Sequence, residues 1–504
     1  MYSYNKLYLR YKKLYSNYLK EITIVLNNYH NKQYDKDYWE PIIGLYLRKF
    51  IINYLFLYKK KNFFKNPNFK KINFYKSFTD FRNNENYFFY KFKHINQYKY
   101  YKIKKIDLYS EKLNSYNTIL SNFLIKLRIT KIFFQESYFK KSLKFLFSLR
   151  SFFYFKSLPF IKSENYKIEK KAIFKNRMNL IKFFEMNNEK DFIMQNIILS
   201  MPINYVEAYD LTLKEVKKIN LSRALYIDGN EVKFDFIKFY IAELILKKKF
   251  ILTGQHSFRS GIEDFDIYFD YSKSISNYYL TWGWDHKSDK ILKYSSTRLF
   301  SSSKKYKEVN KIDDNQFKIC FILSGFYRIG ECLADNYNEN SKIEVSRMIL
   351  LEKIKKQKKC KISLKPRSGS FLVKNKETFY NRFHILRNKS RMYEIFGNYH
   401  VVLFEKLSLG IAECIHLNQP TIFYYPKNLY KQKNKKYNEL LFLLKKAKIF
   451  FDNKNDILDL LSSKKKIFLW WSNTNNIKNR KEVLKKFANC FVYKDLNIIK
   501  KIIE

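Results

Sequence analysis

Apolar residues follow two different patterns along the chain. From about residue 192 onward, short apolar runs of strand length alternate with longer stretches that have helical spacing. Before residue 180, apolar residues stand among Lys-rich faces with almost no Gly or Pro between them, which predicts a mostly helical region. Strands that alternate with helices are typical of parallel sheets with helices on both faces.

The first alternating series contains two strands that end in turn residues. The expected strands are Ala224–Ile227, closed by Asp228-Gly229, and Phe250–Thr253, closed by Gly254-Gln255-His256. Between them, Asp235 can cap a helix that carries an apolar stripe. The series opens with an apolar run at Phe192–Leu199 and a stretch of helical spacing at Tyr205–Ile219.

A second series begins near residue 316. Its expected strands are Phe317–Leu323, Cys360–Leu364, His400–Phe404, Thr421–Tyr424 and Lys448–Phe451. Its expected helices are Ile343–Lys355, Ser408–Leu417, Tyr437–Lys446 and Lys478–Phe491. Because the polar stretch Lys304–Asp314 separates the series, we predict an α/β protein with two Rossmann-like, doubly wound domains that face a cleft. The expected domains are a mostly helical N-terminal region (1–190), a first Rossmann-like domain (191–310) and a second one (311–504).

The charge of the chain changes this interpretation less than its size suggests. The 504 residues carry 98 Lys and Arg against 46 Asp and Glu, a formal net charge of +52. Lys, Asn, Ile, Phe and Tyr are enriched and Gly, Ala and Pro are depleted, which a genome rich in A and T would produce without selection for a polyanion. The charge is also spread along the chain, so we expect no specific nucleic-acid partner. Attraction to an anionic membrane surface remains open.

Targeting features are few. No stretch approaches the ~18 to 20 apolar residues of a membrane span, and the first residues do not resemble a signal peptide. The five cysteines are widely spaced and form no C-x-x-C pair, which is typical of a reducing compartment. We therefore expect a cytoplasmic protein, with peripheral contact at the inner face of the cell membrane left open.

The loop that follows the strand Phe250–Thr253 is the sharpest candidate site. Gly254 allows the backbone to turn, and His256 lands just beyond the strand tip. The loop collects a titratable imidazole, hydroxyls, a guanidinium and backbone N–H groups, which suits a phosphate-bearing donor or a general base. The alternative is a loop histidine that caps a turn. The candidate phosphate contacts here are Gly254, Gln255, Arg259, Ser260 and Gly261.

Two motifs directly after this loop are open to a structural explanation. Asp264 and Asp266 form a D-x-D pair, which in other proteins holds a divalent ion against a diphosphate. Such pairs are usually solvated surface residues, so we predict no metal site. The segment Thr281-Trp-Gly-Trp284 can form a stacking wall for a sugar or base, or can simply pack at a strand end.

Strand ends of the second series carry the other candidates. Lys365 and Arg367 follow one strand and suit a phosphate, although two exposed basic residues are an equally good explanation. Ser408 opens the next helix, whose first N–H groups can receive a phosphate oxygen close to Gly410. Glu413 lies further along the helix and can accept hydrogen bonds from a ribose. The alternative is a capped helix start with a surface Glu.

Several segments together resemble a family of transferases that is encoded with surface-polysaccharide genes and has a GT-B-like architecture of two Rossmann domains. The order and rough spacing agree along the whole chain except for residues 60–190. The resembling segments are Leu26-Asn-Asn-Tyr-His30, Tyr38-Trp39, Ile43-Gly44, Met201-Pro202 with Tyr205 and Glu207, Gly254 to Gly261, Leu280 to Trp284, Ser408 to Glu413, Pro420-Thr421-Ile422 and Trp470-Trp471.

This resemblance implies a glycosyl-type transferase that uses a nucleotide-sugar donor and a glycan or lipid-linked glycan acceptor, with no cofactor and no obligatory metal. The C-terminal domain would hold the donor and the N-terminal side the acceptor. His256, or a carboxylate such as Glu263, would take the acceptor proton, and Lys365, Arg367 and Ser408 would meet the diphosphate. The rival hypothesis is a non-enzymatic binding protein that its positive charge directs to nucleic acid or an anionic membrane.

Overall fold

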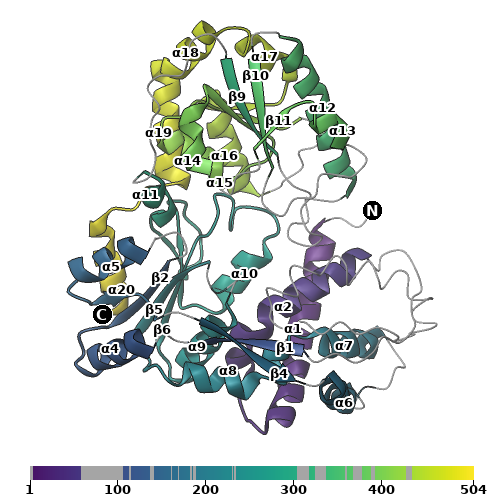
Figure 1. The fold of residues 1–504 in the computed structure, drawn as a ribbon, viewed down its shortest axis with the longest axis vertical. Helices are drawn as coiled ribbons and strands as arrows, with labels where there is room; N and C mark the ends of the chain where they lie inside the picture. Colours follow the sequence, from purple (N-terminus) through teal and green to yellow (C-terminus); the bar gives the residue numbers. More distant parts are fainter. Residues whose placement is uncertain are drawn as a thin grey trace. The chain divides into compact units, whose positions relative to one another are not determined.

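The computed structural model describes most of the chain and divides it into two compact units. The described residues are 4–57, 106–112, 115–136, 141–159, 162–168, 170–181, 184, 189–229, 231, 234–303, 317–323, 337–357, 360–366, 377–386, 392–426 and 434–504. The first unit comprises 1–254 and 267–279, and the second comprises 255–266 and 280–504. Figure 1 labels the helices and strands of both units.

The first unit contains a helical N-terminal part and most of one sheet. Its helices are α1 (Tyr4–His30), α2 (Lys36–Leu57), α4 (Ser115–Lys126), α5 (Lys141–Arg150), α6 (Lys170–Ile181), α7 (Glu189–Ser200), α8 (Tyr209–Val216), α9 (Asp235–Leu246) and α10 (Ile267–Ser274), with a 3-10 turn at Ile203–Tyr205. Its strands are β1 (Ile106–Lys112), β2 (Ile132–Glu136), β3 (Phe155–Lys156), β4 (Lys162–Ile168), β5 (Ala224–Asp228) and β6 (Phe250–Gly254). Strand β7 (Tyr278–Thr281) begins in this unit and ends in the second.

The first six-stranded sheet has the order β3-β2-β5-β6-β7-β8, where β8 is Ile291–Lys293. Strands β3, β2, β5 and β6 run parallel, with Glu136 level with Asp228 and Ile227 level with Thr253. The carboxyl ends of these strands therefore meet at one edge of the sheet. Strands β1 and β4 form a separate antiparallel pair.

The second unit is built on another six-stranded sheet. Its strands are β9 (Phe317–Leu323), β10 (Cys360–Pro366), β11 (His384–Ile385), β12 (Val401–Phe404), β13 (Thr421–Tyr424) and β14 (Phe450–Phe451). Its helices are α11 (Thr297–Ser303), α12 (Tyr337–Lys356), α13 (Glu377–Tyr380), α14 (Met392–Ile395), α15 (Leu409–His416), α16 (Lys435–Lys446), α17 (Lys454–Leu460), α18 (Lys464–Ser472), α19 (Thr474–Phe487) and α20 (Leu496–Ile503), with 3-10 turns at Phe396–Asn398 and Tyr493–Asp495.

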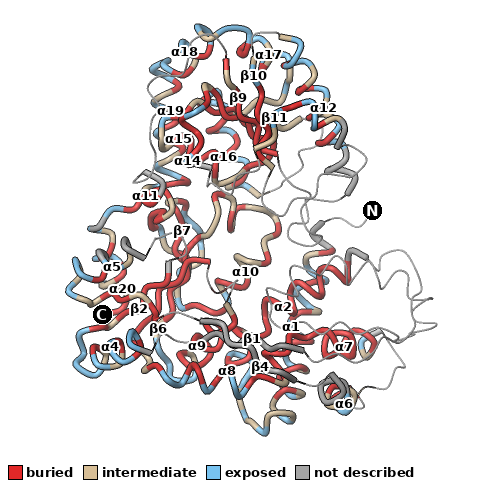
Figure 2. The backbone as a smooth tube through the Cα atoms, in the orientation of Figure 1, coloured by how far each residue is buried: buried red, intermediate tan, exposed pale blue. Residues whose placement is uncertain are grey.

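The order of this second sheet is β11-β10-β9-β12-β13-β14, and every neighbouring pair is parallel. Numbered along the chain, these strands read 3-2-1-4-5-6, so the order reverses between β9 and β12. This is the doubly wound arrangement in which ligands bind beyond the carboxyl ends of the strands at the reversal. Its core is the buried apolar surface of the central strands, coloured red in Figure 2, packed against helices such as α12.

These features confirm the predicted α/β class, with two Rossmann-like sheets and a helical N-terminal region. Three details differ from the sequence analysis. The apolar run Phe192–Leu199 lies in helix α7, and four strands, β1 to β4, lie within the region expected to be mostly helical. Asp235 is the first residue of α9 and does not cap it. Its carboxylate instead accepts hydrogen bonds from Lys238 and Tyr205, because a buried charge needs partners.

The N-terminal segment that carries part of the family resemblance joins α1 to α2. Asn27 Oδ1 accepts hydrogen bonds from the Trp39 indole at 2.9 Å and from the backbone N–H of Tyr34 at 3.2 Å. The Tyr38 hydroxyl bonds to Tyr209 at 2.7 Å, and His30 Nε2 lies 3.2 Å from the carbonyl of Tyr205. Burial lowers the pKa of His30 to about 4. These residues therefore hold the two helices and the following domain elements together, with His30 neutral near pH 7.

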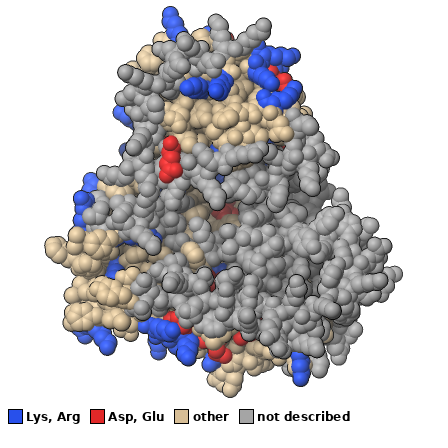
Figure 3. Space-filling model, in the orientation of Figure 1, with Lys and Arg blue, Asp and Glu red and all other residues tan. Residues whose placement is uncertain are grey.

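Charged side chains are distributed over the described surface. On the face drawn in Figure 3, Lys and Arg lie at several separate places among the described residues, and Asp and Glu stand between some of them. The expected linker Lys304–Asp314 lies outside the described residues.

Candidate functional site

A single glutamine joins the two motifs that follow β6 and β7. Gln255 Oε1 accepts hydrogen bonds from the backbone N–H of Trp282 at 2.7 Å and from the indole N–H of Trp284 at 2.8 Å. Its Nε2 donates to the carbonyl of Ser257 at 2.7 Å, and the residue is fully buried. The amide group therefore holds the segment 255–266, which we call the histidine loop, against the T-W-G-W segment 281–284.

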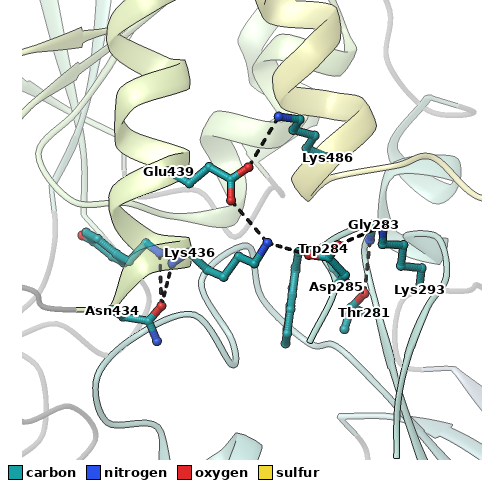
Figure 4. A network of polar contacts seen from close by, with 10 residues as sticks. Thr281, Gly283, Trp284, Asp285, Lys293, Asn434, Lys436, Glu439 and Lys486 are labelled. Atoms are coloured by element: carbon teal, nitrogen blue, oxygen red, sulfur yellow. Dashed lines mark hydrogen bonds and ion pairs between the residues drawn. The ribbon is translucent and has the colours of Figure 1, made fainter. Parts of the chain in front are cut away.

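The T-W-G-W segment is itself fixed to the last helices of the second unit. Gly283 has φ +119°, and a Cβ there would lie 2.8 Å from the carbonyl oxygen of Lys485 in α19, so a glycine is required. Next to it, Asp285 forms ion pairs with Lys436 at 2.5 Å and with Lys293 at 3.3 Å, as Figure 4 shows. Hydrogen bonds from these two lysines lower the pKa of Asp285 to about 2.

Both tryptophans of this segment are packed in the interior. Trp282 is 1% exposed and Trp284 is 2% exposed. Thr281 Oγ1 donates to the carbonyl of Trp284 at 2.5 Å, which closes the turn. The same oxygen accepts from the backbone N–H of Gly283 at 3.4 Å (Figure 4). A stacking wall for a sugar or base needs an accessible ring face, so the structure supports packing and not stacking as the role of these two rings.

The histidine loop is held by hydrogen bonds among its own residues. The hydroxyls of Ser257 and Ser260 lie 3.0 Å apart, and the backbone N–H of Gly261 donates to Asp266 Oδ2 at 3.2 Å. Gly261 has φ +79°, a conformation that favours glycine. His256, between Gln255 and these bonds, is only partly buried. The loop thus fixes the backbone on both sides of His256 while the imidazole stays partly accessible.

Two other predicted residues of this loop pair with each other. Arg259 Nη1 lies 2.9 Å from Glu263 Oε1, with side chains 20% and 7% exposed. The carboxylate of Glu263 is thus already engaged by a neighbouring guanidinium. His256 is therefore the better candidate for the general base. The loop also meets α16, where Asn434 Nδ2 donates to the carbonyl of Glu263 at 3.5 Å.

At the reversal point of the second sheet, the structure brings two predicted residues to one edge. Lys365 of β10 and Phe404 of β12 are both level with Ile322 of β9, which lies between them. Neighbouring strands are ~4.8 Å apart, so the backbones of Lys365 and Phe404 are about 10 Å apart. Ser408 follows Phe404 by four residues. Burial lowers the pKa of Lys365. Arg367 lies outside the described residues.

The junction between β12 and α15 is held in place by an ion pair three residues before Ser408. Glu405 is buried and accepts hydrogen bonds from the guanidinium of Arg347 in α12, with Arg347 Nη2 at 2.7 Å from Glu405 Oε1. Ser408 occupies the N-cap position of α15 but makes no capping hydrogen bond. Its Oγ is buried and meets no hydrogen-bond partner among the described residues. The junction therefore presents a hydroxyl and the first N–H groups of a helix, which have no partner within the helix.

Glu413 has a partner that the sequence did not indicate. The residue is fully buried in α15, and its Oε1 lies 2.6 Å from Nε of Arg298 in α11. Gly410 is buried one turn before it. A ribose hydroxyl that binds Glu413 has to share this carboxylate with the guanidinium.

Four charged residues that shape these strand ends were not predicted as site residues. Arg347 and Glu405 fix the β12–α15 junction, and Arg298 holds Glu413. Asp228 is fully buried at the carboxyl end of β5, directly after Ile227, which is level with Thr253 of β6. Only Asp228 left a signal, as the acidic residue that closes a short strand before a glycine. The partners of the other pairs are far apart in sequence, so spacing alone could not reveal them.

A family model described as "LIC12162 family transferase" matches residues 78–502. No curated protein matches the chain. Similar solved structures include the UDP-GlcNAc 2-epimerase of Methanocaldococcus jannaschii in complex with UDP-GlcNAc and UDP (14% identity, 59% of this chain and 78% of that one, TM-score 0.36). OtsA in its apo form is 9% identical, and the match covers 74% of this chain and 98% of that one with a TM-score of 0.38. A variant of the wall teichoic acid polymerase TagF is 10% identical, and the match covers 77% of this chain and 97% of that one with a TM-score of 0.34.

None of the helices in the described part of the chain combines the length and the apolar character that crossing a bilayer demands.

Proposed function

Because the chain belongs to the LIC12162 family of transferases, we propose that it moves a sugar, or a related group, from a nucleotide-activated donor to a cell-surface polysaccharide precursor. Membership in a transferase family sets aside the alternative of a non-enzymatic binding protein. The proposed architecture is GT-B-like, with two Rossmann-like units and no obligatory metal. The donor and acceptor classes come from the resemblance described in the sequence analysis.

The observation that carries the donor side of this proposal is the reversal of strand order between β9 and β12. In doubly wound sheets, nucleotides bind beyond this point. Here it is bordered by the cation of Lys365 and by the N-terminus of α15 with the buried hydroxyl of Ser408. Negative charge grows on the diphosphate as the bond to the sugar breaks, and such groups stabilise it. Arg367 is proposed as a second cation and Glu413 as the ribose contact.

The acceptor proton is assigned to His256. The histidine loop belongs to the same compact unit as the second sheet and touches α16 of that unit through Glu263. This common unit supports the proposal that His256 acts on a donor bound near Ser408. The guanidinium of Arg259 is proposed as a further phosphate contact. The predicted contacts through the backbone N–H groups of Ser260 and Gly261 are not proposed again, because these groups already donate to the carbonyl of Ser257 and to Asp266. Gln255 acts indirectly, because its amide is bonded to Ser257, Trp282 and Trp284.

A panel of nucleotide sugars tests the proposal. The melting temperature of the full chain is measured with UDP-, GDP-, CDP- and CMP-sugars in turn. A ligand that binds only the native state increases the free energy of unfolding, by about 2.7 kcal/mol at a ligand concentration of 100 times Kd, and therefore raises the melting temperature. We expect one nucleotide class to raise the melting temperature of the wild type and to have a smaller effect on Lys365→Ala. If no nucleotide sugar changes the melting temperature, the proposed donor class is wrong.

A further inference from the structure

Helix α4 turns its apolar face outward. Large apolar side chains along one side of it are exposed, whereas the small polar residues Thr118 and Ser121 are buried. A helix of a globular protein usually does the opposite, because burial of apolar area stabilises the fold. The exposed apolar residues of α4 and the turn after it, with their exposed fractions, are Tyr116 (75%), Ile119 (69%), Leu120 (37%), Phe123 (56%), Leu127 (53%) and Ile129 (38%).

Helix α5 continues this surface. Phe145 and Leu149 lie one turn apart on α5 and are 60% and 49% exposed, and Phe152 in the next turn is 87% exposed. The turns that follow the two helices are joined, because Thr130 Oγ1 donates to the carbonyl of Phe153 at 2.9 Å. Both helices therefore end at the same place on the first unit. In Figure 3, the place that α4 and α5 occupy in Figure 1 is mainly tan, with basic side chains at its edges.

The segment that forms this surface carries almost entirely positive charge. Residues 115–159 contain eight Lys or Arg and a single acidic residue, Glu136. Lys126, Arg128 and Arg150 are exposed beside the apolar side chains. Two copies of such a surface repel each other, whereas a layer of anionic lipid headgroups attracts it. Apolar side chains with Lys and Arg at their margin are typical of helices that lie in the plane of a membrane interface.

We propose that α4, α5 and the turns after them form a docking surface for an anionic lipid bilayer. Phe123, Phe145 and Phe152 enter the boundary between headgroups and acyl chains, and the basic residues contact lipid phosphates. This function goes beyond the proposed transfer reaction and does not depend on it. A bilayer-docked enzyme would, however, meet a lipid-linked acceptor at the surface where that acceptor resides.

Flotation of the full chain with vesicles tests the surface. One set of vesicles contains equal parts of phosphatidylglycerol and phosphatidylcholine, and the other contains phosphatidylcholine alone. The variant Ile119→Ser/Phe123→Ser/Phe152→Ser removes exposed apolar side chains. The control Phe442→Ser/Phe468→Ser/Leu469→Ser removes side chains of similar exposure from α16 and α18. We expect the wild type and the control to bind the anionic vesicles equally, and the α4–α5 variant to bind at least about 10-fold more weakly.

Three outcomes would overturn the proposal. Equal binding by the α4–α5 variant would mean that overall charge, or another surface, holds the protein on lipid. Failure of the wild type to bind would exclude a membrane role. A concentration-dependent dimer of the wild type that is lost in the variant, without vesicle binding, would assign the surface to a second copy of the chain. If the triple variant does not fold, Phe152→Ser serves in its place, because that side chain is 87% exposed.

Discussion

The loop after β6 and the junction after β12 are both strand-end segments, yet they are constructed in opposite ways. In the first, the side chains bond to one another, since Gln255 joins Ser257, Trp282 and Trp284. In the second, the anchoring bonds lie before the helix, at Glu405, and the hydroxyl of Ser408 has no partner among the described residues. The first arrangement suits the fixed placement of one side chain, and the second suits the reception of an anion.

The two segments also differ in how much a fixed structure helps their proposed roles. A residue that must abstract a proton has to be held within a short distance of its target, and hydrogen bonds on both sides of His256 restrict its backbone. A diphosphate brings its own charge and oxygen acceptors, so the receiving segment needs donors that are not already satisfied. The following predictions test whether the two segments differ in this way.

The largest effect is expected from His256→Ala. If His256 takes the acceptor proton, turnover falls by about 10²–10⁴-fold, the usual contribution of general base catalysis. We expect the fold to persist, because the substitution leaves in place the hydrogen bonds that Gln255 and Asp266 make within the loop and to Trp282. The measurement is kcat together with the Kd of the donor, and only kcat should change. A variant with full turnover would remove His256 from the reaction.

A smaller but still large effect is expected from Gln255→Leu. The substitution leaves the N–H groups of Trp282 and Trp284 without their acceptor in the interior, and each unsatisfied donor costs ~1–3 kcal/mol. We expect a loss of about 2–4 kcal/mol in the free energy of unfolding, measured by urea denaturation. Gln255→Glu keeps an acceptor oxygen for both tryptophans and should be less destabilised. Equal stability of Gln255→Leu and the wild type would contradict the role of Gln255 in holding the two segments together.

The sequence predicted some strands accurately and missed others, depending on their apolar pattern. Strands such as Phe317–Leu323 and Ala224–Ile227 were located almost residue by residue, because short apolar runs end in turn residues there. Strands β1 and β4 were missed, since their residues include Lys, Ser, Asn and Glu and show little alternation. Strands β2 and β3 were missed because they are only five and two residues long and lie among stretches with a helical pattern. Local pattern predicts an element only where burial imposes a regular period.

For the candidate site residues, the sequence predicted positions along the chain but not hydrogen-bond partners. The position of His256 at a strand end follows from the apolar run and Gly254, so sequence reasoning could place it. The buried role of Gln255 depends on residues 27 and 29 positions away, Trp282 and Trp284, and local spacing carries no information about such partners. The partner of Glu413, Arg298, lies 115 residues away for the same reason. Long-range hydrogen bonds therefore decide which polar residues remain for a ligand.

Lys365 allows the anion-receiving segment to be tested by pH. Burial lowers the pKa of Lys365, so its ammonium loses the proton at a lower pH than an exposed lysine does. If it contacts the donor diphosphate, donor affinity is full below this pKa and falls as the pH rises through it. Lys365→Arg should keep its affinity to higher pH, and Lys365→Ala should bind about 10-fold more weakly near neutral pH. Calorimetric titration between pH 7 and 10 measures this, and identical pH profiles for all three proteins would contradict it.

The smallest effect, and the sharpest test of the contrast, is expected from Ser408→Ala. An N-cap serine normally stabilises its helix, and its replacement by alanine costs about 1 kcal/mol. Ser408 makes no capping bond, so stability should change by less than ~0.5 kcal/mol. Asn434, which caps α16 by accepting from the N–H groups of Lys436 and Tyr437, is the matched control, and Asn434→Ala should show the full loss. Donor affinity should fall only about threefold in Ser408→Ala, the effect of one neutral hydrogen bond. A serine that proves to stabilise its helix as much as Asn434 does would be a structural cap, and the hydroxyl would then not be reserved for a phosphate.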